Sequence, residues 1–189
     1  MKISILGSNL DLLMEEVEAL TEYPFDCNEQ LASKLKGLLI LKKISSLRNI
    51  PFKKEGQINK IIRMLERNRQ PSGMWGWWKN TQEEYWITLH VTEALLQAEK
   101  SGYQVNWNIS LMIDIIHQHL NTKQSNFNQI WQLELLYHLD TVSNITGVIR
   151  RFDTLPNLSI HERLRLDLLK SGLKLPVDPA PYLYMLQPA

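Results

Sequence analysis

The sequence has little of what several classes of protein require. Its 189 residues include one cysteine, which excludes an internal disulfide and a zinc site built on cysteines. The net charge of +1 disfavours a nucleic-acid binder held by phosphate neutralisation. No apolar run reaches the roughly 20 residues of a membrane span. We therefore expect no nucleic-acid partner, no bound metal or cofactor, and no membrane span in this chain.

The alternation of apolar and polar residues that marks half-buried strands is also missing. Apolar residues instead recur at helical spacing in eight segments, at about 10–20, 27–39, 58–65, 88–98, 109–120, 130–137, 145–152 and 160–169. The tripeptide Lys-Ser-Gly ends two of them, at 100–102 and 170–172, a separation of two units of about 35 residues. This pattern predicts an all-α fold of stacked helical hairpins.

We expect one helical domain over residues 1–175. The tail over 176–189 contains Pro176, Pro179, Pro181 and Pro188, and its composition predicts irregular structure. Helical spacing also predicts a shared core made of Leu10, Leu13, Val17, Leu35, Leu38, Ile61, Ile62, Val91, Leu95, Ile113 and Ile116.

Charge is unevenly distributed along the first third of the chain. Acidic residues dominate residues 11–29, from Asp11 to Glu29, and basic residues dominate 34–63, from Lys34 to Arg63. The favoured interpretation is two solvated helix faces that attract each other. The alternative is a docking surface for another domain.

The single cysteine lies close to a glutamine at the expected start of the second helix. Cys27 and Gln30 are three residues apart, so their side chains share a face of the first helical turn. A thiol beside a carboxamide can displace ammonia and leave an internal thioester. The helix N-terminus stabilises a thiolate, and a dry aromatic shell keeps water from the acyl carbon. The candidates for that shell are Tyr23, Phe25, Trp75 and Trp77.

From the residues alone, Cys27 could also be a buried, inert thiol. A cysteine-protease site would need a histidine and an orienting group in space, and none of the five histidines is singled out by its position.

The residues around Cys27 resemble a known family. Residues 23–30, Tyr-Pro-Phe-Asp-Cys-Asn-Glu-Gln, are similar to the Cys-x-Glu-Gln thioester motif of the alpha-2-macroglobulin and complement family, with its aromatic-Pro-aromatic lead. Residues 69–78 resemble the glutamine-proline-x-glycine-aromatic loop of bacterial members, and residues 86–96 the helix that follows. The resemblance covers about residues 8–120. Asp26 stands where the family has glycine, and Asn28 occupies the variable position of the motif.

The resemblance implies a fold and a function. The fold is an α/α toroid of helical hairpins, of the terpenoid-cyclase type, and this chain offers too few helices to complete it. The function is that of a thioester-containing domain of a bacterial endopeptidase inhibitor, not an enzyme, which traps the attacking protease covalently. Gln30 supplies the acyl group and Cys27 the leaving sulfur.

The same resemblance implies partners and a location. The partners are target proteases and the neighbouring macroglobulin domains of a longer parent chain. That parent is expected in the periplasm, the cell envelope or the extracellular space.

Two other functions stay open. The chain could be a toroid-type enzyme acting on a lipid or glycan, with the tryptophan loop as a platform, although it has no Asp-x-Asp-Asp run. It could also be a degenerate interaction module without a thioester. In family members that favour hydroxyl targets, a histidine lies before the helix that residues 86–96 resemble. This chain has no histidine between Gln30 and His90, so the resemblance implies a thioester that reacts with amines rather than hydroxyls.

Overall fold

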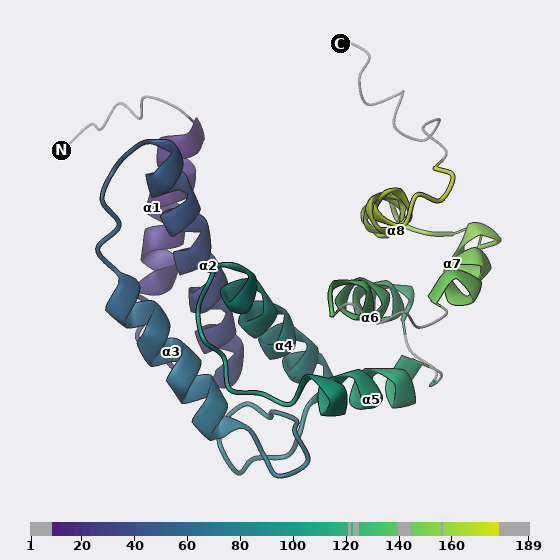
Figure 1. Ribbon diagram of the computed structural model, residues 1–189, viewed down its shortest axis with the longest axis horizontal. Helices are drawn as coiled ribbons and strands as arrows, with labels where there is room; N and C mark the ends of the chain where they lie inside the picture. The colour runs from purple at the N-terminus through teal and green to yellow at the C-terminus, as the bar shows by residue number, and fades with distance from the viewer. Residues whose placement is uncertain (1–8, 121, 123–124, 140–144, 156, 178–189) are drawn as a thin grey trace. The chain divides into compact units, whose positions relative to one another are not determined.

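The computed structural model describes residues 9–120, 122, 125–139, 145–155 and 157–177, and the side chains of all of these except Asn9, Leu10, Leu13 and Asp153. Within these ranges the secondary structure is helical, and the one β-type pairing is an isolated bridge between Gly76 and Glu83. The predicted all-α fold is confirmed (Figure 1). The helices are α1 (Asn9–Thr21), α2 (Asn28–Leu47), α3 (Glu55–Asn68), α4 (Tyr85–Lys100), α5 (Ile109–Leu120), α6 (Asn126–His138), α7 (Ile145–Asp153) and α8 (Ile160–Gly172).

The chain divides into two compact units, residues 1–112 and residues 113–189, with the division inside α5. In the first unit α2 is the central helix and packs against α1, α3 and α4 (Figure 1). Leu31, Leu35, Leu38 and Leu41 of α2 are all buried, because neighbouring helices cover it on several sides. The apolar residues of α2 are accordingly spread around the helix and not confined to one face, which suits a helix with neighbours on several sides.

The predicted core is mostly confirmed. The predicted residues that are buried are Leu35, Leu38, Ile61, Ile62, Val91, Leu95 and Ile116. Val17 and Ile113 are only half-buried, so the prediction is wrong for them. Val17 lies on α1, which has its main packing contact with α2 alone and therefore leaves more of its surface to solvent. The side chains of Leu10 and Leu13 lie outside the described residues.

The acidic and basic segments do attract each other. Arg48 Nη1 lies 2.7 Å from Asp11 Oδ1, and Lys34 Nζ lies 2.6 Å from Asp26 Oδ1. The interpretation as solvated faces fails for Lys34, whose side chain is only 7% exposed. Lys34 lies on the face of α2 that also carries buried apolar residues, so packing removes it from water.

The end of α4 follows the predicted pattern. The helix stops at Lys100, and Gly102 has a φ of +90°, in the left-handed region that glycine adopts most readily. The backbone N–H groups of Gly102 and Tyr103 donate to the carbonyls of Glu99 and Ala98, which closes the last turn.

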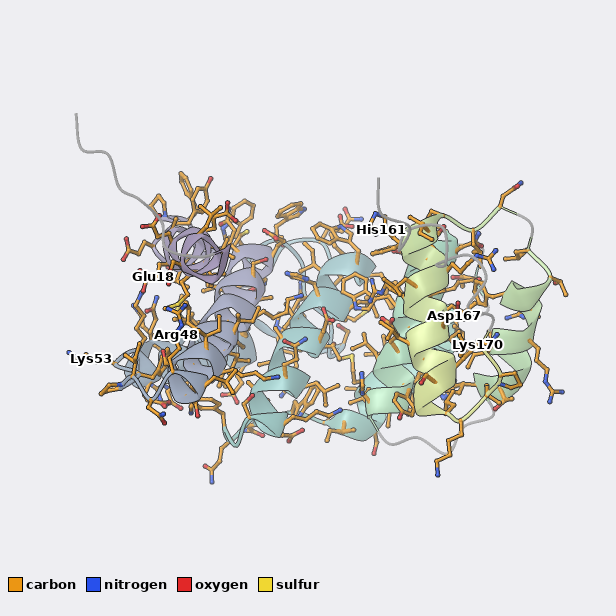
Figure 2. All side chains as sticks on the ribbon, turned by 90° about the horizontal axis from the view of Figure 1, so that it is seen from above. Glu18, Arg48, Lys53, His161, Asp167 and Lys170 are labelled. Carbon is orange, nitrogen blue, oxygen red and sulfur yellow. The ribbon has the colours of Figure 1, made fainter. Side chains whose placement is uncertain are left out.

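In the second unit α6 packs against both α7 and α8. Arg165 of α8 donates through Nε to both carboxylate oxygens of Glu134 on α6, at 3.1 and 3.0 Å, and its guanidinium carbon lies 4.9 Å from the ring centroid of Phe127. Asp167 and Lys170, labelled on α8 in Figure 2, form a nearly buried pair on the same helix, 3.9 Å apart. None of the helices that the structure describes has the length and apolar character needed to cross a membrane.

Candidate functional site

Cys27 and Gln30 meet at the first turn of α2. Cys27 is the N-cap residue, and the backbone N–H of Cys27 donates to the side-chain Oε1 of Gln30 at 3.3 Å. The Cys27 side chain takes the reciprocal place opposite the backbone N–H of Gln30, which completes a capping box. Cys27 is 3% exposed and Gln30 is half-buried. The structure therefore brings together the two residues whose spacing predicted a reactive pair.

Asn28 fixes this turn to the rest of the first unit. Its backbone N–H donates to the carbonyl of Trp77 at 2.8 Å, and its side-chain Nδ2 donates to the carbonyl of Gly76 at 2.9 Å. Its Oδ1 accepts from Asn68 Nδ2 of α3 at 2.8 Å. Asn28 is completely buried, so these bonds form away from competing water. Asn28 is the variable position of the motif, and nothing local in the sequence predicts that it anchors the turn.

The loop between α3 and α4 is held rigidly where it meets Asn28. Trp75 is completely buried; its indole N–H donates to the Leu65 carbonyl at 2.8 Å, and its backbone N–H donates to Thr88 Oγ1 at 3.0 Å. A Cβ atom at Gly76 would clash with the carbonyl oxygen of Gln82. Only glycine fits there, and this close approach lets the loop present its carbonyls to α2.

The four residues expected to shield the site differ in exposure. Trp75 lies in the core, whereas Tyr23, Phe25 and Trp77 are 48%, 62% and 40% exposed. The rings of Tyr23 and Phe25 contact each other at a centroid distance of 5.5 Å. Trp77 packs edge-to-face against Trp86 at 5.4 Å. Three of the four aromatic side chains are therefore partly exposed. Tyr23 and Phe25 precede Cys27, and Trp77 lies in the loop that binds Asn28.

Lys34 and Asp26 form an ion pair beside the same turn. Lys34 Nζ donates to Asp26 Oδ1 at 2.6 Å and to the carbonyl oxygen of Phe25 at 2.8 Å. The lysine side chain therefore runs back along α2 to the two residues that precede Cys27. A sequence signal existed in the opposite charges of Asp26 and Lys34, but the burial of Lys34 depends on tertiary packing.

Glu29, the acidic residue of the motif, connects α2 to α4. The hydroxyl of Ser33 donates to Glu29 Oε1 at 3.0 Å and lies 3.0 Å from Nε2 of His90 on α4. Lys36 Nζ lies 3.1 Å from His90 Nδ1 and 2.8 Å from Glu93 Oε2. An ammonium group can only donate, so Nδ1 accepts, and the proton of the neutral ring is on Nε2.

The surroundings of His90 favour that neutral form. Burial lowers the pKa of His90 below its ordinary value of 6.5, and the positive charge of Lys36 lowers it further. The carboxylates of Glu29 and Glu93 act in the opposite direction. Both ring nitrogens of His90 have a partner on α2. These partners are Ser33, about one helical turn after Gln30, and Lys36. The helical spacing over residues 88–98 includes His90, but no local pattern predicts its contact with α2.

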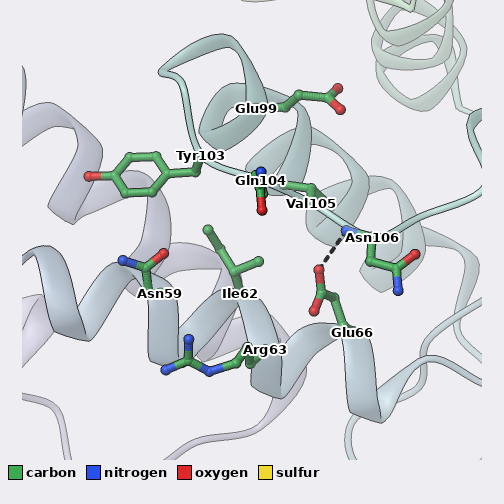
Figure 3. Close-up of a pocket in the computed structure, with 9 residues that line it drawn as sticks. All are labelled: Asn59, Ile62, Arg63, Glu66, Glu99, Tyr103, Gln104, Val105 and Asn106. Atoms are coloured by element: carbon green, nitrogen blue, oxygen red, sulfur yellow. Dashed lines mark hydrogen bonds between the residues drawn. The ribbon is translucent and has the colours of Figure 1, made fainter.

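A polar cavity of about 700 Å³ lies between α3 and the extended segment that follows α4 (Figure 3). The backbone N–H of Asn106 donates to Glu66 Oε1 at 2.6 Å at its edge. None of the predicted site residues lines it. The lining residues are Asn59, Ile62, Arg63, Glu66, Glu99, Tyr103, Gln104, Val105 and Asn106.

Among the described residues no group of three or more histidine, cysteine, aspartate or glutamate side chains could hold a metal ion.

Comparison with known proteins gives a partial match. No protein-family profile matches the chain. Over 96 residues the chain is 32% identical to alpha-2-macroglobulin of Escherichia coli strain K12, a match that covers 47% of this chain and 6% of that protein. The chain thus corresponds to a small part of the length of this relative. The similarity supports a resemblance to the alpha-2-macroglobulin family.

Proposed function

We propose that this chain is a thioester-containing domain of an alpha-2-macroglobulin-like protease trap. The observation that carries the proposal is the capping box at the start of α2, in which the buried Cys27 side chain and the half-buried Gln30 carboxamide occupy one turn. The partial similarity to an alpha-2-macroglobulin supports the family, and the Cys-x-Glu-Gln sequence supports the position.

The geometry suits formation of a thioester. The Sγ atom of Cys27 would attack the Cδ atom of Gln30 and displace ammonia, and negative charge would develop on Oε1 during the attack. The backbone N–H of Cys27 already donates to Oε1, so it would stabilise that charge. The positive end of the α2 dipole lies at the same turn and would also stabilise the negative charge that develops on Oε1.

The rigid support of the turn also suits this function. Asn28 and the carbonyls of Gly76 and Trp77 hold the reactive pair in place, which reduces the cost of bringing thiol and acyl carbon together. We propose that Tyr23, Phe25 and Trp77, which are exposed in this chain, contribute to a water-excluding shell when neighbouring domains of a parent chain cover them. Trp75 supports that shell from the core.

In the trap, a nucleophile of an attacking protease would add to the Gln30 acyl carbon. The carbon–sulfur bond would break, the Cys27 thiolate would leave with the electron pair, and the protease would remain bound through the new acyl linkage. The proposed partners are therefore target proteases and the adjacent macroglobulin domains. We place the parent protein in the periplasm, the cell envelope or the extracellular space of a bacterium.

The experiment is intact mass spectrometry of the purified chain before and after exposure to methylamine. The proposal expects a mass that is low by one ammonia, followed by addition of one methylamine and appearance of one free thiol. A chain with its full calculated mass and an unmodified Gln30 would exclude the thioester and leave an interaction module. A mass with Gln30 converted to glutamate would indicate a thioester that water has already opened.

A further inference from the structure

A lysine next to the proposed thioester takes no part in the trapping reaction. The inference about it rests on the proposed function. Lys34 is four residues beyond Gln30, so the two side chains share one face of α2 and are direct neighbours. A primary amine is the kind of nucleophile that opens a thioester. A lysine in this position could attack the Gln30 acyl carbon and disarm the domain before it meets a target.

The structure holds the Lys34 amine away from that reaction. Its Nζ donates to Asp26 Oδ1 at 2.6 Å and to the Phe25 carbonyl oxygen at 2.8 Å, and both acceptors belong to residues that precede Cys27. In an ion pair the nitrogen is an ammonium, which has no lone pair for attack. The Lys34 side chain is 7% exposed, so bulk water does not readily replace Asp26 as its partner.

We propose that the Asp26–Lys34 ion pair protects the thioester from internal aminolysis. Asp26 stands where the family resemblance leads us to expect glycine, which has no side chain to bind an amine. The buried lysine and the carboxylate that restrains it thus form one unit in this chain. The device keeps the acyl group for an external nucleophile.

Without Asp26, the Lys34 amine would open the thioester by attack on the Gln30 acyl carbon. The Lys34 ammonium loses a proton to solvent, and the amine lone pair forms a bond to Cδ of residue 30. The carbon–sulfur bond breaks, and the Cys27 thiolate leaves with the bonding electrons and takes up a proton. The products are an amide between residues 30 and 34 and a free thiol, with no oxidant or reductant involved.

The test compares four full-length chains: wild type, Asp26→Asn, Lys34→Arg, and the double variant. Asparagine keeps the size of Asp26 but cannot hold an ammonium by charge, and the guanidinium of arginine does not attack thioesters. Each chain is exposed to methylamine, weighed intact, and mapped by proteolysis for a link between residues 30 and 34. Circular dichroism checks that each variant keeps its helical content.

We expect wild type and Lys34→Arg to take up methylamine. Asp26→Asn should still lack one ammonia but take up no methylamine, and it should carry a free thiol and the 30–34 link. The double variant should regain methylamine uptake, which a merely structural role of Asp26 does not predict.

Three results would overturn the inference. The first is undiminished methylamine uptake by Asp26→Asn. The second is a full-mass Asp26→Asn chain, because Asp26 would then serve formation of the thioester. The third is hydrolysis of Asp26→Asn and the double variant alike, because water and not Lys34 would be the excluded nucleophile. Full mass in the wild type is a different outcome: it removes the proposed function, and the inference with it.

Discussion

Two helices of this chain begin with the same hydrogen-bonded arrangement made from different atoms. At the start of α8, the backbone N–H of Ser159 donates to Glu162 Oε2 at 2.8 Å, and the Ser159 hydroxyl accepts from the backbone N–H of Glu162 at 3.3 Å. At the start of α2, Cys27 and Gln30 take the two places. The serine box is exposed to solvent, whereas Cys27 is buried.

The residues of the α8 box are better at capping a helix, whereas those of the α2 box carry the groups of the proposed reaction. Serine and glutamate are good capping residues, because a hydroxyl oxygen and a carboxylate accept strongly from N–H groups. Sulfur is a weak acceptor and a carboxamide is uncharged, so the α2 box is the poorer cap. Its two side chains, however, are the pair that can condense. The α2 turn therefore has the weaker cap, and the buried hydrogen bonds of Asn28 add support to it; we propose that the reactivity of the pair is what this weaker cap serves.

The largest expected effect comes from giving the α2 box the hydroxyl group of the α8 box. Cys27→Ser should keep the capping box and the helical content but abolish loss of ammonia and methylamine uptake completely, because a hydroxyl does not form the proposed thioester. Intact mass and circular dichroism measure both. Methylamine uptake that persists in this variant would show that a different acyl group reacts.

The converse exchange is the matched control. The double variant Ser159→Cys with Glu162→Gln places the reactive pair at the same spacing in an exposed turn. We expect it to keep its full mass, since open access of water and the lack of a rigid support disfavour a lasting thioester. Loss of ammonia at α8 would mean that spacing alone is sufficient and that burial is not required.

The second prediction concerns the choice of nucleophile. Both nitrogens of His90 are engaged, Nδ1 by Lys36 and Nε2 by Ser33, so this imidazole is not free to attack the acyl carbon. We therefore expect methylamine adducts to dominate over glycerol esters when each reagent is supplied at equal concentration. His90→Gln should leave this ratio unchanged. Dominant glycerol ester formation that depends on a histidine would contradict the prediction.

The third prediction tests the support of the α2 turn. Asn28→Ala should lower the free energy of unfolding by about 2–4 kcal/mol, because it leaves the Gly76 carbonyl and the Asn68 amide without their buried partner. Chemical denaturation measures the change. The control is Asn59→Ala, an exposed asparagine on α3, which should cost less than about 0.5 kcal/mol. Equal losses for the two variants would show that Asn28 does not anchor the turn.

The presence of the helices and the proximity of Cys27 to Gln30 could be predicted from the sequence, since both follow from local spacing. Apolar periodicity predicted the segments that became α1 to α8, and a separation of three residues placed Cys27 beside Gln30. Contacts between distant segments were not predictable in this way. Asn28 is joined to residues about 40 and 48 positions away, and His90 to Ser33 across 57 positions. No short pattern encodes such contacts, because packing of helices creates them.

Lys34 illustrates the same limit in a single residue. In the sequence it opens a basic segment and is typical of a solvated face, yet the structure buries it against Asp26 and the Phe25 carbonyl. Charge sign was predictable, and burial was not, because burial depends on how α2 is covered by its neighbours.

The smallest expected effects concern how the stability of the folded chain depends on pH near each of the two capping boxes. The α2 box is linked through Glu29 and Ser33 to His90, whose pKa is lowered chiefly by burial. The folded state therefore disfavours proton uptake by His90, so its stability is fully present above about pH 6.5 and declines as the pH falls below that value. His90→Gln should remove this part of the pH dependence of the melting temperature.

The α8 box should respond at lower pH. Hydrogen bonds from the Ser159 hydroxyl and then from its backbone N–H lower the pKa of Glu162 below its ordinary value of 4.5. The stabilisation from this carboxylate is present above pH 4.5 and is lost as the pH falls through its lowered pKa. Ser159→Ala should cost about 1 kcal/mol at neutral pH, as removal of an N-cap does, and should reduce the acid sensitivity below pH 4.5 only. Melting curves from above pH 6.5 to below pH 4.5 separate the two windows for wild type, His90→Gln and Ser159→Ala. A changed pH slope above pH 6.5 in either variant would contradict this assignment, because each group can alter the slope only where its own protonation differs between folded and unfolded chains.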